Sequence, residues 1–344
     1  MRISKDGFFS KLSGKTPYAG AGTTKIHAPN DSCVWKVLGV LLVAICLSQF
    51  GIAQNPGINF PPTQGSSGTG AFQPGIYNYS YTNAQIAASN STFNMMRLPI
   101  NVETANEPAS LAKLQGYVNQ FAGHYAIICM FDTLENGQTG HGDGKPNDLS
   151  AMGAAWGKIN AVFASYPNVH YEIFNEPFYY TNAVQYVSDM ETIINDAGLP
   201  YSKCILDGMG YADDVNSVAG GGWSGDMAYH FYPNWVPSGQ TTQSNYSNRA
   251  QADLGSWGQK TWVTEFGANL SFNNNCYDTY VDGSYPDINT LRGLDDALRA
   301  LKANGHGVKG AFSWHGWNNG DTYDYWASGN SNGACKVREI ESHD

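Results

Sequence analysis

The sequence predicts an α/β fold, with a single domain built as a (β/α)8 (TIM) barrel. From Gly57 onward, short apolar runs alternate with segments of helical periodicity. Most of these runs are apolar at both odd and even positions, as expected for parallel strands that are covered on both faces. The alternating region has about the 250 residues usual for such a barrel. A doubly wound open sheet is the alternative, but residues 57–70 lack the G-x-G-x-x-G phosphate turn that usually follows its first strand.

Eight apolar runs are the expected strands: "GINF" (57–60), "FNMMRLPI" (93–100), "YAIICMFD" (125–132), "VHYEIFNEP" (169–177), "KCILDG" (203–208), "MAYHFY" (227–232), "TWVTEFGA" (261–268) and "VKGAFSWHGW" (308–317). Amphipathic segments between them are the expected helices, at residues 110–123, 151–166, 183–198 and 288–305. Gly198 and Gly305 are placed to end two of these helices, because glycine readily adopts the left-handed conformation of a helix C-terminus. No eighth helix can be recognised after residue 317.

The first 53 residues differ from the rest and are expected to be a leader. Residues 37–53 form a short apolar run that follows Lys36 and ends in Gly51-Ile52-Ala53, which is the layout of a secretory signal. A membrane anchor is the alternative, although the run is near the lower length limit for spanning a bilayer. We therefore expect residues 54–344 to form the barrel domain of a secreted protein, either extracellular or periplasmic.

The cysteines outside this leader fall into two kinds. Cys129 and Cys204 lie in apolar runs and are expected to be buried free thiols. Cys276 and Cys335 lie in polar loops, where an exported protein could join them in a disulfide. Spacing alone does not assign the pair.

Composition restricts the class of ligand. The formal net charge of -10 argues against a nucleic-acid partner, because phosphate binding needs clustered lysine and arginine. The chain is rich in aromatic side chains, with 9 Trp and 21 Tyr, and in Asn, Gly and Ser. Such a mixture suits neutral ligands that carry many hydroxyl groups, since flat rings stack on sugar faces.

Polar and charged residues gather at the carboxyl ends of the expected strands. In a barrel these ends form the functional face. The residues concerned are Arg97, Asn175, Glu176, His230, Tyr232, Glu265 and Trp314. Packing alone does not explain polar groups at one end of strands that are otherwise apolar, so this pattern predicts a site.

Two carboxylates across a barrel mouth have one well-understood use, the cleavage of a glycosidic bond. One carboxyl group donates a proton to the leaving oxygen, and the other attacks the anomeric carbon as a carboxylate. Arg97 would favour the charged form of a carboxylate nearby, and Tyr232 can donate a hydrogen bond to one. The alternatives are structural: a satisfied core histidine for His230 and a structural ion pair for Arg97.

The motifs at these strand ends resemble those of one enzyme family. "YEIFNEP", "MMRLPI", "AYHFY", "WVTEFGA" and "FSW" together are similar to glycoside hydrolase family 5, in the larger clan A of barrel glycosidases. "GINF" is similar to the opening strand of many cellulases of that family. The resemblance runs from about Pro56 to Trp317. "NEP" alone is weakly specific, whereas NEP, H-x-Y and T-E-F-G in this order are strongly so.

The resemblance implies a role for each of these residues. Glu176 would be the general acid/base and Glu265 the nucleophile, about 5 Å apart in an enzyme that retains configuration. The resemblance further implies substrate-binding or orienting roles for Asn175 at the sugar 2-hydroxyl, for Arg97, His230 and Tyr232 at the carboxylates, and for Trp314 as a platform under the sugar. It implies no metal and no organic cofactor.

The sequence departs from the family at the end of the third strand. Family cellulases commonly have an Asp-x-His-Asn run there, whereas "CMFDTLENG" places Cys129 and Phe131 near those positions. Asp132, or else Glu135, is expected to supply the missing hydrogen bond to the sugar. The departure bears on which sugar is recognised more than on the type of reaction.

We therefore expect a retaining endo-β-1,4-glucanase, a cellulase that cleaves internal bonds of cellulose-type polysaccharides by double displacement. A mannanase, a xyloglucanase or another β-hemicellulase of the same family is the first alternative. A non-catalytic carbohydrate-binding barrel is the second, although both catalytic positions are glutamate. The expected partner is a β-glucan or related plant polysaccharide, bound by a monomer, with no nucleic acid and no membrane in the mature form.

Overall fold

The computed structural model describes residues 56–62, 75–121, 125–131, 144–146, 148–268, 271–272, 275–276 and 285–314. These residues belong to one compact unit, Ala53–Asp344. Eight strands close into a barrel in the order β1-β10-β7-β6-β5-β4-β3-β2. Every neighbouring pair is parallel, so the predicted (β/α)8 barrel is confirmed.

The barrel strands coincide with the eight predicted runs. They are β1 (Pro56–Asn59), β2 (Met95–Ile100), β3 (Tyr125–Met130), β4 (Val169–Glu172), β5 (Cys204–Asp207), β6 (Asp226–Phe231), β7 (Thr261–Phe266) and β10 (Ala311–Ser313). A separate antiparallel pair, β8 (Ser271–Phe272) and β9 (Asn275–Cys276), lies outside this ring.

The fourth strand is shorter than predicted, and the difference shapes the site. The prediction extended it to residue 177, but β4 ends at Glu172. The N–H of Ile173 still bonds to Ile205 of β5, at 3.0 Å, whereas the N–H of Asn175 bonds to Met130 of β3, at 2.8 Å. The chain therefore crosses from one neighbour to the other after Glu172, and Asn175 and the residue after it lie on a loop.

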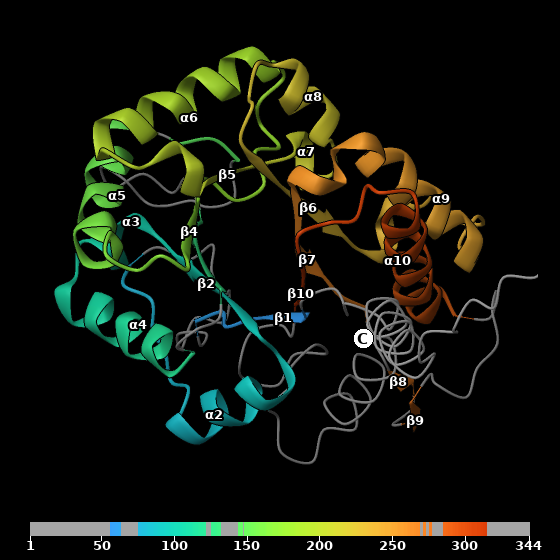
Figure 1. The fold of residues 1–344 in the computed structure, drawn as a ribbon, viewed down its shortest axis with the longest axis horizontal. Coiled ribbons are helices and arrows are strands. Elements are labelled where there is room, and N and C mark those ends of the chain that lie inside the picture. Colours follow the sequence, from blue (N-terminus) through green and yellow to red (C-terminus); the bar gives the residue numbers. More distant parts are fainter. Residues whose placement is uncertain are drawn as a thin grey trace, which may run out of the picture. The chain divides into compact units, whose positions relative to one another are not determined.

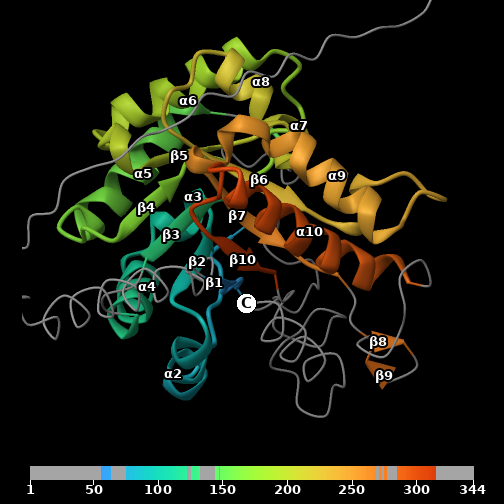
Figure 2. The same ribbon diagram turned by 45° about the vertical axis from the view of Figure 1, so that its right-hand side comes forward.

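Helices surround the strands (Figure 1). They are α2 (Asn83–Thr92), α3 (Val102–Ala105), α4 (Pro108–Gln120), α5 (Leu149–Phe163), α6 (Ala183–Ala197), α7 (Met209–Ala212), α8 (Val215–Gly220), α9 (Gln243–Leu254) and α10 (Pro286–Ala303). Short 3-10 turns are η3 (Tyr201–Lys203), η4 (Pro233–Trp235) and η5 (Gly255–Lys260). Figure 2 shows α9 and α10 packed side by side.

Four of these helices, α4, α5, α6 and α10, are the predicted ones. Gly198 ends α6 in the left-handed region, with φ 63°, as predicted. Gly305 also has a positive φ, 77°, but it follows the C-cap of α10, which is Asn304. The prediction missed α9 because "QSNYSNRAQADL" is mostly polar, and only Tyr246, Ala250 and Leu254 give it a buried stripe at helical spacing.

The barrel interior is apolar toward the amino ends of the strands. Its inward-facing side chains form a separate cluster of Met95, Ile127, Ile205, Ala228, Trp262 and Phe312. Gly57 of "GINF" leaves room for this cluster, because a Cβ atom there would lie 2.4 Å from the ring of Phe312. The barrel is therefore filled with side chains, as expected for its size.

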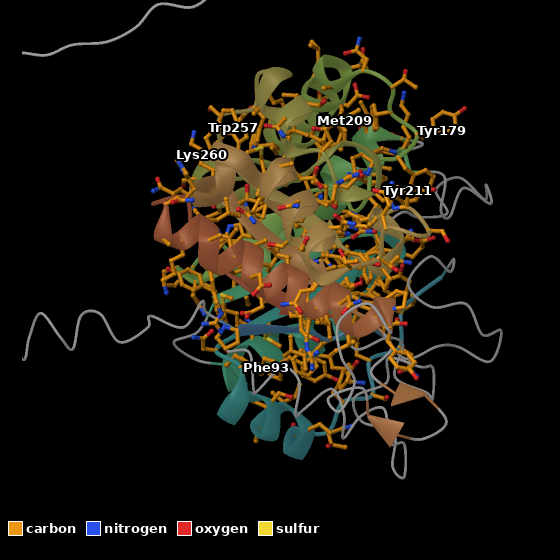
Figure 3. The ribbon with its side chains drawn as sticks, turned by 90° about the vertical axis from the view of Figure 1, so that its right-hand side faces the viewer. Phe93, Tyr179, Met209, Tyr211, Trp257 and Lys260 are labelled. Atoms are coloured by element: carbon orange, nitrogen blue, oxygen red, sulfur yellow. The ribbon has the colours of Figure 1, made fainter. Side chains whose placement is uncertain are left out.

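The next inward layer, two residues further along the strands, is polar. It consists of fully buried Asn59, Arg97, Cys129, Glu172, Asp207, His230 and Thr264. This layer lies toward the carboxyl ends of the strands. In Figure 3 Tyr179 and Tyr211, which follow β4 and β5, lie on the right, whereas Trp257 and Lys260, which precede β7, lie on the left.

Cys129 and Cys204 are buried free thiols, as predicted. The predicted leader 1–53, the side chain of Cys276, Cys335 and the region after Trp314 lie outside the described residues. Among the described residues, no helix combines the length and the apolar character needed to cross a bilayer.

Candidate active site

Arg97, on β2, is the centre of the buried polar layer. Its Nε and Nη2 atoms donate to the two carboxylate oxygens of Glu172, each at 2.7 Å, and Nη1 donates to Glu265 Oε1 at 2.5 Å. Nη1 also donates to Asn59 Oδ1 at 3.0 Å. Burial alone would raise the pKa of Glu172, but the Arg97 guanidinium outweighs burial and holds that pKa well below its usual range. Glu172 is therefore a permanent negative charge beneath the site.

A bulge in β7 turns Glu265 toward Arg97. Tyr229 and His230 of β6 are paired with Val263 and Glu265, so that Thr264 is an extra residue in β7. Consecutive side chains of a regular strand point to opposite faces, and a bulge changes this. Thr264 and Glu265 therefore both reach the barrel interior, where the Tyr232 hydroxyl donates to Glu265 Oε2 at 2.6 Å. Arg97 and Tyr232 thus hold one oxygen each of a carboxylate that is only 4% exposed.

Glu176 lies on the loop after β4, opposite Glu265. Its Oε1 atom lies 2.9 Å from His230 Nδ1, and His230 Nε2 lies 3.1 Å from Thr264 Oγ1. Burial opposes a charge on the imidazole, but the carboxylate of Glu265 and hydrogen bonds with Glu172 and Glu176 outweigh burial and raise the pKa of His230. His230 is a hydrogen-bonded member of the site and not merely a core residue.

The two predicted carboxyl groups face one another across this histidine. One ligand atom each of Glu176, His230 and Glu265 lie within 4.8 Å of one another. His230 Nδ1 is also 3.6 Å from Glu265 Oε2. Two carboxyl groups at such a separation can act together on a single bond of a ligand.

Sequence comparison identifies the family. The model of the family Cellulase (glycosyl hydrolase family 5) matches residues 55–322, which include every barrel strand. The chain belongs to glycoside hydrolase family 5. No curated protein sequence gives a significant match.

Solved structures share the fold of this family 5 hydrolase at low sequence identity. Endo-β-1,4-glucanase Xac0029 from Xanthomonas axonopodis pv. citri is 18% identical, with a TM-score of 0.56 over 81% of this chain and 92% of that one. Endoglucanase Cel5A from Pseudomonas stutzeri, in complex with cellobiose, is 15% identical, with a TM-score of 0.59 over 85% and 92%. XacCel5A in complex with cellopentaose has a TM-score of 0.61 at 16% identity, over 86% and 100%.

Asn175 is also in this constellation. Its Oδ1 accepts from Arg97 Nη2 at 2.8 Å. Its Nδ2 is buried and has no hydrogen-bond partner among the described residues. Because a buried unpaired donor is unfavourable, this amide is available for a ligand. The contact of this amide with a sugar hydroxyl stays a prediction.

Where the sequence departs from the family pattern at β3, this family 5 hydrolase places a thiol and an aromatic ring against Arg97. Cys129 Sγ accepts from Arg97 Nη2 at 3.0 Å, and the Phe131 ring lies 5.5 Å from the Arg97 guanidinium carbon. Phe131 stacks on Trp314, with ring centroids 6.4 Å apart and an interplanar angle of 26°. Trp314 follows β10 and is 8% exposed. Asp132 and Glu135, predicted to replace the missing hydrogen bond, lie outside the described residues.

Two sets of side chains have the composition of a metal site. Glu172, Asp207 and His230 form one, and Glu176, His230 and Glu265 form the other. Arg97 already bonds to a carboxylate of each set, so a metal ion would compete with a fixed positive charge. The raised pKa of His230 also disfavours the neutral imidazole that binds metals. The donor set therefore fits hydrogen-bonded carboxylates better than a metal.

Sequence reasoning missed the fully buried Asn59, Glu172, Asp207 and Thr264. Glu172 of "YEIF" and Asp207 of "CILDG" could have been predicted to be site residues, because a carboxylate inside an apolar strand needs buried partners. The sequence offers no such reason for Asn59. Its amide donates to the carbonyl groups of Thr264 and Ser313, at 3.1 and 3.2 Å, and so fastens β1 to β7 and β10.

Proposed function

We propose that the protein is a retaining endo-β-1,4-glucanase that hydrolyses internal bonds of a β-glucan by double displacement. The observation that carries the proposal is the approach of Glu176 and Glu265, whose carboxyl oxygens lie within 4.8 Å. Retaining glycosidases keep their carboxyl groups about 5–5.5 Å apart, whereas inverting ones leave about 6.5–9.5 Å for a water molecule. The glucanase activities named for the similar structures support the choice of substrate.

In the first step, a Glu265 oxygen attacks the anomeric carbon and the bond from that carbon to the leaving oxygen breaks. Glu176 gives its proton to that oxygen, and a glycosyl ester forms on Glu265. Arg97 and Tyr232 orient the attacking carboxylate through the hydrogen bonds described above. Asn175 offers its free amide to the sugar.

In the second step, Glu176 takes a proton from water, whose oxygen attacks the anomeric carbon and releases Glu265. His230 Nδ1, 2.9 Å from Glu176 Oε1, keeps the Glu176 carboxyl group in place through both steps. When Glu176 carries its proton, the charges of Arg97 and His230 balance those of Glu172 and Glu265. A buried cluster is most stable when its charges are paired in this way.

We also propose that the protein is exported, which the signal-like run at residues 37–53 supports. An extracellular or periplasmic location suits a polysaccharide substrate that cannot enter the cell.

A panel of polysaccharides tests the substrate. We expect barley β-glucan and carboxymethylcellulose to be hydrolysed faster than glucomannan, mannan, xyloglucan and xylan, with viscosity falling before many reducing ends appear. Reducing-sugar release and viscometry measure the two quantities. A Glu265→Ala preparation, purified in the same way, corrects for contaminating activity.

Two results of the panel would contradict the proposal. Faster hydrolysis of mannan or xyloglucan than of β-glucan would show that the protein is a hemicellulase of the same family. Binding without hydrolysis of any substrate would point to the non-catalytic carbohydrate-binding barrel.

A further inference from the structure

Asp207, the last residue of β5, is fully buried between Glu172 and the loop that carries Glu176. Its Oδ2 atom accepts the backbone N–H of Glu176 at 2.8 Å. Its Oδ1 atom is buried and has no partner among the described residues. The Asp207 side chain takes no part in the two proposed steps, although it contacts Glu176, the residue proposed to donate the proton.

The backbone of Glu176 has a conformation that needs support. Its φ is 50°, in the left-handed region, and Ala212 is the only other non-glycine residue with a positive φ among the described residues. Residues other than glycine keep such a conformation only where their surroundings enforce it. Pro177 follows and has no N–H to contribute. The backbone N–H of Glu176 donates its hydrogen bond to the side chain of Asp207.

The conformation decides where the carboxyl group of Glu176 points. The last backbone hydrogen bond to a neighbouring strand before Glu176 is the one from the N–H of Asn175 to Met130 of β3, so strand pairing does not extend to Glu176 itself. The carboxyl group nevertheless reaches His230 Nδ1 at 2.9 Å and comes within 4.8 Å of Glu265. Without an acceptor at position 207, the partly buried N–H of Glu176 would lose its side-chain partner, and a rotation of that peptide could bring the N–H to another acceptor.

We propose that Asp207 is a positioning residue for the proton-donating step: by accepting the N–H of Glu176, it holds the left-handed backbone that aims the Glu176 carboxyl group at the scissile bond. The inference rests on the proposed function, since it requires Glu176 to be the acid. Asp207 does not touch the substrate and acts through Glu176.

The surroundings of Asp207 show which substitution preserves its role. Burial and the neighbouring Glu172 carboxylate raise the pKa of Asp207 well above its usual value, which favours the neutral acid. The titratable groups that face it are Glu172, His230, Arg97, Tyr186 and Cys129. Asparagine has the shape of this neutral acid and keeps an oxygen for the N–H of Glu176. Alanine removes the acceptor.

Two substrates distinguish a misplaced Glu176 carboxyl group from a general loss of activity. Barley β-glucan has a poor leaving group and needs the proton, whereas 2,4-dinitrophenyl β-cellobioside needs little proton donation. We expect Asp207→Ala to lower kcat/KM on β-glucan by about 100-fold, the loss typical of a misplaced catalytic group. On the aryl substrate the loss should be at least about tenfold smaller. Asp207→Asn should keep wild-type kcat/KM on both substrates.

Asp226→Ala is the matched control. Asp226 lies at the start of β6, at the opposite end of the barrel from the site, where its carboxylate accepts from Lys309 Nζ at 2.6 Å and from Trp262 Nε1 at 3.0 Å. Its loss should lower thermal stability and leave the ratio of the two kcat/KM values unchanged. If Asp207→Ala does not fold, Asp207→Leu fills the same space without supplying an acceptor. The ratio of its kcat/KM values on the two substrates then tests the inference.

The inference is overturned if the acceptor-free variant loses activity equally on both substrates or keeps full activity. A selective loss in Asp207→Asn would overturn it too. These results would leave the wild-type glucanase activity intact. If the wild-type protein hydrolyses neither substrate, the proposed function fails and this inference fails with it.

Discussion

Replacing Glu265 with alanine is expected to lower hydrolysis of barley β-glucan by about 10⁴-fold or more, since the variant lacks the group that attacks the anomeric carbon. Such a loss corresponds to about 5.4 kcal/mol of activation free energy. Binding of β-glucan, followed by affinity electrophoresis, should persist, because Asn175 and Trp314 remain. The loss of a partner for Arg97 is the structural cost, and Glu172 and Asn59 still bond to that guanidinium.

Glu191→Ala provides the control for this variant. Glu191 lies on α6, outside the barrel, and its removal should leave hydrolysis unchanged. Added azide gives a second check, because it can enter the space left by Glu265, attack the anomeric carbon and leave an α-glycosyl azide. Hydrolysis by Glu265→Ala at the wild-type rate would exclude Glu265 as the nucleophile.

Glu176→Ala is expected to show the second large effect, which depends on the substrate. On β-glucan, kcat/KM should fall by about 10²- to 10⁴-fold, the usual contribution of a general acid. On 2,4-dinitrophenyl β-cellobioside, kcat/KM should stay near the wild-type value because that leaving group departs without a proton. Steady-state kinetics on the two substrates measures the difference.

Azide distinguishes the two carboxyl groups in this variant as well. Here the glycosyl ester on Glu265 still forms, so azide should attack it and give a β-glycosyl azide, with an increase in kcat on the aryl substrate. If both substrates lose the same factor and azide restores nothing, the acid role belongs to another residue.

The strand pattern was enough to predict the barrel. Runs that are apolar at both odd and even positions indicate parallel strands that are covered on both faces. Each such run corresponds to one strand of the barrel. Helix α9 escaped prediction because only Tyr246, Ala250 and Leu254 form its buried stripe. The end of β4 was placed too late because the apolar residues Ile173 and Phe174 continue past the point where the chain leaves the ladder.

For the site, the sequence predicted Arg97 and His230 of the buried polar layer and missed Asn59, Glu172, Asp207 and Thr264. The sequence predicted that Tyr232 donates to a carboxylate without distinguishing Glu176 from Glu265, and the structure shows the bond to Glu265. The bulge that turns Thr264 inward is invisible in a strand pattern of period two. Glu172 and Asp207 could have been singled out as carboxylates in apolar strands, but their partners became known only when β2, β4, β5 and β6 were placed side by side.

The buried polar layer explains how the site keeps its geometry. Arg97 bonds to Glu172 below and Glu265 above, so that a buried ion pair orients the carboxylate proposed to react. Removing one partner of such a buried pair is strongly destabilising, whereas the complete pair contributes order more than stability. The site is therefore built on the closed barrel and not on its loops alone.

Proton NMR of the first products from β-glucan tests the paired action of Glu176 and Glu265 most directly. Double displacement at a β bond predicts that the β anomer of the new reducing end appears first and that the α anomer forms later, by mutarotation. If the α anomer appears first, water attacks the anomeric carbon directly, and the account of two carboxyl groups acting through a glycosyl ester is wrong.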